Sequence, residues 1–287
     1  MNTDLLLDVL VPAYNRTEGL RVILNAYALA PGNVRLILSD DSTTDAVEQL
    51  VSQHPVRDKV VYRRNTPSLG AIPNWNSLME LAEAPYLLLM HHDDVPNEVN
   101  FFELLVQELK IGDVDALLLD IWLPGIFPNR LRRHSTCFLR SLVVQHCPGY
   151  LLIRNLLGPP SVFVLRSNLA IPFDPAIPWM VDVTWYVRIL EMKSLQIRLV
   201  AKPSLRSFLF KDSISGLLED SPMQRRQKES RHLLNAGYKS YFLGMNAGSS
   251  LGHRFAWFLE QLIWPVLRAR DSRSRMRWVR SPASCGK

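Results

Sequence analysis

The stretch LLLDVLVPAYNR, residues 5–16, decides how the N-terminal half folds. Leu5 to Val11 is a nearly continuous apolar run, which is typical of a strand buried on both faces of a parallel sheet. It stops at Pro12, and apolar residues at helical spacing follow from Glu18 to about Leu29. The stretch therefore predicts a strand, a polar turn and a helix in immediate succession.

Strand and helix patterns keep alternating as far as residue 120. Beyond Trp122 the pattern is less regular, and residues 122–150 are expected to form a loop-bearing insert. This alternation predicts an α/β domain with a largely parallel sheet flanked by helices. The strands are expected at 34–38, 60–62, 86–90, 116–120, 161–165 and 197–200, and the helices at 46–53, 74–82, 98–110, 181–192 and 222–241.

Composition excludes several classes of protein. The chain has 287 residues, of which 47% are hydrophobic and 21% charged, an ordinary globular balance. Its three cysteines form no Cys-x-x-Cys motif, so neither a disulfide scaffold nor a zinc ribbon is expected. The N-terminus lacks the pattern of a signal peptide, and no apolar run reaches the roughly 18 residues of a membrane span. We therefore expect a cytoplasmic protein.

The formal net charge of +6 is concentrated at the C-terminus. Residues 251–287 carry eight basic and two acidic side chains, interleaved with aromatic residues such as Trp257 and Trp264. One interpretation is an interfacial helix that binds an anionic membrane surface on the inner face of the cytoplasmic membrane. The other is a helix packed on the domain with solvated arginines. No RNA-binding signature accompanies the basic residues, so a nucleic-acid partner is not expected.

Acidic pairs follow two of the predicted strands. Asp40 and Asp41 follow residues 34–38, and Asp93 and Asp94 follow residues 86–90. Ligands bind outside the carboxyl ends of strands in an open parallel sheet, so these pairs are expected to share one crevice. Carboxylate oxygens suit Mg²⁺ or Mn²⁺. The alternative for either pair alone is a helix cap or a turn.

Phosphate-binding glycine motifs are missing from the sequence. Neither Gly-x-x-x-x-Gly-Lys-[Ser/Thr] nor Gly-x-Gly-x-x-Gly follows the first strand, which argues against P-loop enzymes and nicotinamide dehydrogenases. No predicted strand leads into a Gly-x-Ser-x-Gly elbow, so an α/β-hydrolase is not expected.

Six motifs follow one another along the chain: VLVPAYNR at 9–16, LILSDDSTTD at 36–45, NWN at 74–76, YLLLMHHDDVP at 86–96, GPPS at 158–161 and MVDVTW at 180–185. In sequence and in order they resemble the motifs of family 2 glycosyltransferases with the GT-A fold. The resemblance covers roughly residues 5–215.

The resemblance implies a role for each motif. Asp93, beside Asp94, would bind the divalent cation, Asp182 would be the general base, and Lys211 would lie in a loop over the diphosphate. His91 stands where the family usually has the first Asp of its Asp-x-Asp motif. The residues expected to hold the nucleotide are Pro12, Tyr14, Arg16, Asp40, Asp41 and Asn74.

The expected domain is GT-A-type over 1–215, with a nucleotide-sugar-binding half at 1–120 and an acceptor half at 121–215. A helical, basic extension is expected at 216–287. The implied activity is that of an inverting, Mn²⁺- or Mg²⁺-dependent hexosyltransferase. It would move sugar from a UDP- or dTDP-sugar to a hydroxyl of a glycan, lipid-linked or other acceptor in cell-surface polysaccharide or glycolipid synthesis. Two alternatives stay open: a catalytically degenerate sugar-nucleotide-binding protein, suggested by His91, and a sugar nucleotidyltransferase.

Overall fold

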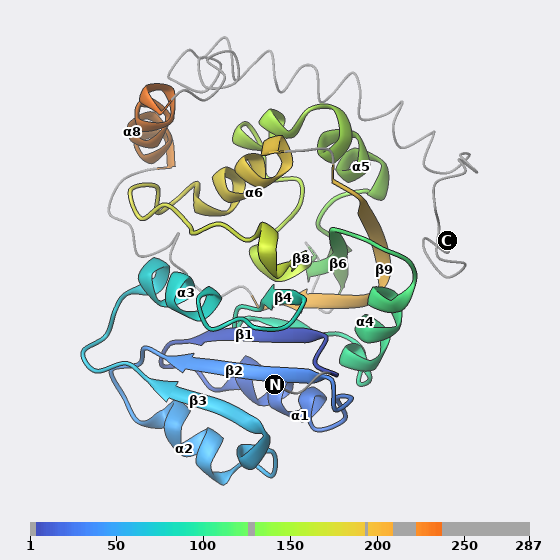
Figure 1. The fold of residues 1–287 in the computed structure, drawn as a ribbon. Coiled ribbons are helices and arrows are strands. Elements are labelled where there is room, and N and C mark those ends of the chain that lie inside the picture. The colour runs from blue at the N-terminus through green and yellow to red at the C-terminus, as the bar shows by residue number, and fades with distance from the viewer. Residues whose placement is uncertain (1–3, 126–129, 193–194, 209–221, 237–287) are drawn as a thin grey trace.

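A computed structural model describes residues 4–125, 130–192, 195–208 and 222–236. Its strands belong to one sheet, and its helices lie around that sheet (Figure 1). The strands are β1 (Leu7–Ala13), β2 (Val34–Asp40), β3 (Val60–Arg64), β4 (Tyr86–Leu89), β5 (Asp94–Pro96), β6 (Ala116–Pro124), β7 (Leu131–Arg133), β8 (Phe163–Arg166) and β9 (Ile197–Ser207). The helices are α1 (Glu18–Tyr27), α2 (Ala46–Gln53), α3 (Ala71–Met79), α4 (Phe101–Lys110), α5 (Cys137–His146), α6 (Val181–Met192) and α8 (Pro222–Asn235).

The sheet confirms the predicted fold class. Its strand order is β3-β2-β1-β4-β8-β6-β9-β5, with β7 paired to β6. The pairs β3–β2, β2–β1 and β1–β4 are parallel, whereas β8 runs antiparallel to both of its neighbours. The N-terminal half is therefore parallel and the second half is mixed. All seven residues of β1 are buried, as its apolar run predicts.

Two elements differ from the pattern expected after Trp122. Residues 137–146, inside the expected loop-bearing insert, form helix α5, which the side chain of Thr136 caps by accepting a hydrogen bond from the Leu139 amide at 3.3 Å. Strand β9 continues to Ser207 instead of ending near Val200, and its far end pairs with the short strand β5. This pairing brings residue 207 beside Asp94.

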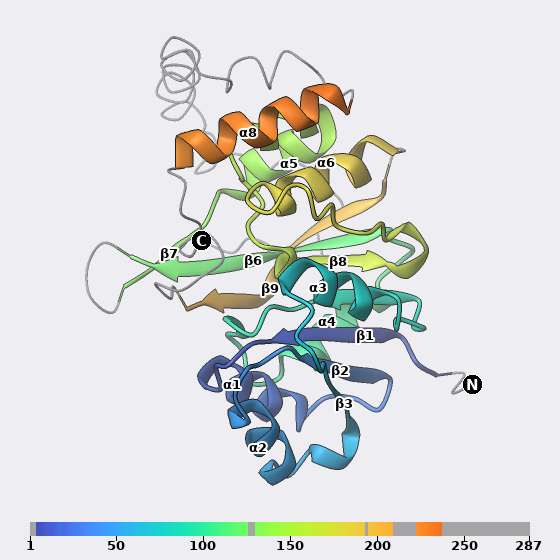
Figure 2. The same ribbon diagram turned by 90° about the vertical axis from the view of Figure 1, so that its left-hand side faces the viewer.

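The predicted C-terminal extension begins with helix α8, which lies near α6, at the end of the structure away from β1, β2 and β3 (Figures 1 and 2). Ser230 and Leu233 of α8 are fully buried, so this helix packs against the rest of the protein. The basic stretch 251–287, on which the membrane prediction depends, lies outside the described residues. Among the residues that are described, no helix is both long and apolar enough to cross a membrane.

Candidate active site

The turn after β4 carries both predicted metal-site residues, Asp93 and Asp94, together with His91. The Asp94 amide donates to the His91 carbonyl at 3.0 Å, and the Phe208 amide donates to the Asp93 carbonyl at 2.8 Å. The first helix approaches the turn so closely that a Cβ added at Gly19 would lie 2.0 Å from the His92 carbonyl oxygen. Backbone contacts from both halves of the sheet therefore fix this turn, and glycine is required where α1 meets it.

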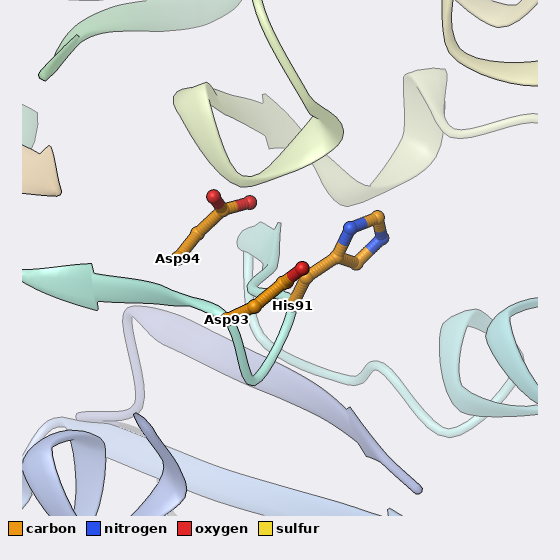
Figure 3. A group of neighbouring side chains, drawn as sticks. All are labelled: His91, Asp93 and Asp94. Carbon is orange, nitrogen blue, oxygen red and sulfur yellow. The ribbon is translucent and has the colours of Figure 1, made fainter. Parts of the chain in front are cut away.

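His91, Asp93 and Asp94 converge at the turn (Figure 3). Each offers one ligand atom, and these atoms all lie within 4.8 Å of one another. The hydroxyl of the fully buried Ser161 donates to Asp94 at 2.7 Å and accepts from the His91 amide at 2.9 Å. Ser161 thus fixes two members of the cluster relative to each other.

Burial and mutual repulsion dominate the electrostatics of the cluster. Burial, followed by the negative charge of Asp93, raises the pKa of Asp94, and hydrogen bonds from Ser161 and Ser207 oppose the rise. Burial lowers the pKa of His91 to about 4, so its imidazole is neutral at pH 7. Two adjacent carboxylates and a neutral imidazole form a donor set that suits a divalent cation, whose charge offsets the repulsion between the acids. The residues present therefore fit a cation such as Mn²⁺.

A row of packed aromatic rings connects this cluster to helix α6. The His91 ring lies 4.6 Å from that of Trp75, centroid to centroid, and Trp75 packs edge-on against Phe173 at 5.3 Å. Phe173 in turn stacks on Trp185 of α6 at 4.8 Å. Asn76 fixes Phe173 by a pair of hydrogen bonds, donating to its carbonyl at 3.0 Å and accepting from its amide at 2.8 Å. These rings form a continuous contact from the turn after β4 to the helix that carries Asp182.

Asp182 lies in the first turn of α6 and is partly buried. Burial, followed by the negative charge of Asp93, raises the pKa of Asp182 to about 7. The negative charge of Asp182 also raises the pKa of Asp94, so the charges of Asp93, Asp94 and Asp182 are coupled. A carboxyl group with a pKa near neutrality can accept a proton and release it again, as a general base must.

The buried carboxylate of Asp41 holds the loop at 68–70 in place through hydrogen bonds. Its carboxylate accepts hydrogen bonds from the Leu69 amide at 2.7 Å, the Gly70 amide at 2.8 Å and the Ser68 hydroxyl at 2.7 Å. The side-chain amide of Asn65 donates to it at 2.9 Å. Asp41 is only 3% exposed, so its contacts in the structure are with the loop that leads into α3. The predicted contact between Asp41 and the nucleotide stays a prediction.

The other predicted nucleotide-binding residues surround the carboxyl ends of β1 and β2. Asp40 is fully buried and accepts from the Tyr62 hydroxyl at 2.7 Å, and Asn74 accepts from the Asn65 side chain at 3.0 Å. The Tyr14 side chain is 46% exposed just beyond β1, so it is free to pack against a ligand.

Three predicted residues remain: Arg16 and Pro12, which are expected to hold the nucleotide, and Lys211, which is expected in a loop over the diphosphate. Arg16 lies in the turn after β1, where its amide donates to the Tyr14 carbonyl at 2.7 Å. Pro12 is buried, and its carbonyl lies 3.1 Å from Nδ1 of His92, which belongs to the turn after β4. Lys211 lies outside the described residues. The end of β1 thus lies beside the turn after β4, and the roles of these residues in nucleotide binding stay predictions.

Glu229 contributes to the site although the sequence gives no indication of it. Its carboxylate accepts from the Trp179 amide at 2.8 Å and from the Met180 amide at 2.7 Å. These amides immediately precede α6, so the side chain acts as a cap at the helix that begins with Val181 and Asp182. Glu229 lies about fifty residues further along the chain, in a helix whose sequence suggests only a polar, solvated surface. Spatial proximity alone reveals this role.

We expect Glu229→Gln to lower kcat while the affinity for the donor stays within about twofold. The substitution leaves one of two nearly buried amides without a strong acceptor, at a cost of about 1–3 kcal/mol to the local structure that holds Asp182. Single-turnover kinetics together with donor titration would separate the two effects. Arg231→Gln, at an exposed position of the same helix, is the control and should change neither quantity. Equal losses of kcat in both variants would contradict the prediction.

Comparisons with known proteins bear on the family and the fold of the chain. Residues 8–171 match the model of the family described as glycosyl transferase family 2. Abequosyltransferase RfbV of Salmonella typhimurium is 27% identical over 95 residues, which make up 31% of this chain and 28% of that protein. The matched stretch thus spans less than a third of this relative.

Solved structures share the fold at low sequence identity. Staphylococcus aureus TarS 1–349, in complex with UDP-GlcNAc, superposes with a TM-score of 0.58 and 17% identity over 95% of this chain and 77% of that one. The mannosyltransferase PcManGT of Pyrobaculum calidifontis, in complex with GDP-Man and Mn²⁺, gives a TM-score of 0.57 and 12% identity over 94% and 76%. The arrangement of strands and helices is the GT-A fold. With the match covering more than half of its length, the chain belongs to glycosyl transferase family 2.

Proposed function

We propose that the protein is an inverting glycosyltransferase that moves a sugar from a UDP- or dTDP-sugar to a hydroxyl group of a glycan or lipid-linked acceptor. The observation that carries this proposal is the position of Asp182, on a different element from Asp93 and Asp94 yet electrostatically coupled to both. Family membership and the nucleotide-sugar complexes of TarS and PcManGT support the class of donor.

In this mechanism different parts of the site bind the nucleotide, bind the cation and accept the proton. The strand ends of β1 and β2 hold the nucleotide, with the exposed Tyr14 ring against it. A divalent cation bound by Asp93 and Asp94 would offset the charge that develops on the departing diphosphate. Asp182 accepts the proton of the acceptor hydroxyl as that oxygen attacks the anomeric carbon.

A single displacement explains why one base is sufficient. The acceptor oxygen attacks from the side opposite the leaving diphosphate, so the configuration at the anomeric carbon inverts and no covalent sugar–enzyme intermediate forms. The shared site holds reacting groups in alignment, which by itself lowers the barrier substantially. The synthesis of cell-surface polysaccharide or glycolipid is the setting that this chemistry and the family suggest.

Product analysis with a panel of UDP- and dTDP-sugars tests the proposal. We expect release of the nucleoside diphosphate that depends on Mn²⁺ or Mg²⁺ and stops on chelation. The first-formed sugar product, followed by proton NMR before mutarotation, should have the anomeric configuration opposite to that of the donor. Retention of configuration, or release that chelation leaves unchanged, would contradict the mechanism. Donor binding without any turnover would instead indicate a sugar-nucleotide-binding protein.

A further inference from the structure

We propose that His91 is itself a ligand of the divalent cation and makes the site favour Mn²⁺ or Co²⁺ over Mg²⁺. This inference rests on the proposed function, because it concerns the cation of the same site. Where an all-carboxylate site offers oxygen donors alone, this chain places an imidazole next to Asp93 and Asp94 (Figure 3).

The surrounding structure fixes the position of His91. Its ring packs against that of Trp75 at a tilt of 33°, with 4.6 Å between centroids, and its amide donates to the Ser161 hydroxyl. The same hydroxyl donates to Asp94, so the imidazole and this carboxylate are positioned by a shared partner. A ligand held in this way needs little rearrangement to bind a cation, which favours affinity.

The ring nitrogens of His91 have no hydrogen-bond partner among the described residues, and Nε2 is buried. An unpaired buried nitrogen is costly, so its persistence beside two carboxylates suggests a partner that the protein chain does not supply. The adjacent His92 provides a contrast. Its Nδ1 lies 3.1 Å from the Pro12 carbonyl, so that ring is engaged elsewhere.

The ligand chemistry decides the preference among cations. Mg²⁺ takes oxygen ligands and loses its water reluctantly, so a nitrogen donor gives it little. Imidazole suits first-row transition metals, and affinity for a mixed nitrogen and oxygen site rises from Mn²⁺ to Co²⁺. One imidazole with two carboxylates therefore shifts the site away from Mg²⁺.

Pulsed electron paramagnetic resonance of bound Mn²⁺ detects a coordinating nitrogen directly. The full-length protein would be loaded with Mn²⁺ alone and then with Mn²⁺ and UDP, whose uracil nitrogens carry no free lone pair. We expect nitrogen-14 modulation in the wild-type protein. It should disappear in His91→Phe, which keeps an aromatic ring against Trp75, and in His91→Asp. The matched control His92→Gln should keep it.

Competition with Mg²⁺ provides a second measurement. His91→Asp should reduce the ratio of Mg²⁺ to Mn²⁺ dissociation constants by about tenfold, because the donor set then contains oxygen alone. Bound Mn²⁺ without nitrogen modulation, or modulation that persists in His91→Phe, would overturn the role of His91 and leave the cation site standing. Mn²⁺ uptake that Asp93→Asn does not weaken would overturn the cation site of the proposed function as well.

Discussion

Asp182→Asn should lower turnover by about 10²- to 10⁴-fold while the protein still binds its donor. The amide has nearly the shape of the carboxylate, but it cannot accept the proton of the attacking hydroxyl. The measurement is kcat at saturating donor, with donor affinity determined separately by titration. A variant with near-normal kcat and weakened donor affinity would show that Asp182 binds substrate or caps α6.

The stability of Asp182→Asn provides an internal control. The raised pKa of Asp182 means that the folded state favours its protonated form, so the ionised group costs stability as the pH rises from about 4 towards 7. Asparagine carries no charge to bury. We therefore expect the variant to be at least as stable as the wild-type protein at pH 8, and lost turnover there cannot be ascribed to unfolding.

Asp174, a second carboxylate in the loop that precedes α6, allows a matched comparison. Asp174 accepts from the Ala176 amide at 2.9 Å and lies 3.5 Å from His232 of α8, so its role in the structure is local. Asp174→Asn should leave kcat within about threefold of the wild-type value, because the base is unaffected. A loss of kcat in Asp174→Asn as large as that in Asp182→Asn would show that the base is Asp174, in the loop before α6.

The parallel half of the fold could be predicted because its signals are local. Buried parallel strands are continuously apolar, and the amphipathic helices between them repeat at helical spacing. Asp40 and Asp93 could be assigned to one region since the carboxyl ends of parallel strands share an edge. Their individual contacts could not be predicted. Nothing in the sequence indicates that the loop at 68–70 folds back onto Asp41.

The second half of the sheet and the helices around it were harder to predict because long-range contacts determine them. Helix α5 presents a buried arginine, Arg140, on the face that a sequence pattern would require to be apolar. Strand β9 has an irregularity in its pairing with β6 between Leu119 and Asp120, so its alternation is interrupted. Likewise, Glu229 reaches α6 from a helix that lies outside the motifs of the family. A pattern confined to neighbouring residues contains none of this information.

Arg140→Leu should destabilise the protein by about 3–5 kcal/mol, because it leaves a buried carboxylate without its principal partner. Arg140 is 3% and Asp120 1% exposed, and the guanidinium lies 2.5 Å from the carboxylate while also donating to the Leu119 carbonyl. Burial already raises the pKa of Asp120, and the positive charge of Arg140 opposes that rise. Arg133, with its Nε 3.2 Å from Asp120, remains as a partner, so we expect the lower end of the range.

Urea unfolding at 25 °C measures this change, with Arg57→Leu as the control. Arg57 pairs with Asp58 at 3.5 Å, but both side chains are more than half exposed, so the control should alter stability by less than about 0.5 kcal/mol. The double variant Arg140→Leu, Asp120→Leu should recover most of the loss, since it removes the buried charge together with its partner. If the double variant is no more stable than Arg140→Leu alone, the cost comes from packing around α5 and not from an unpaired carboxylate.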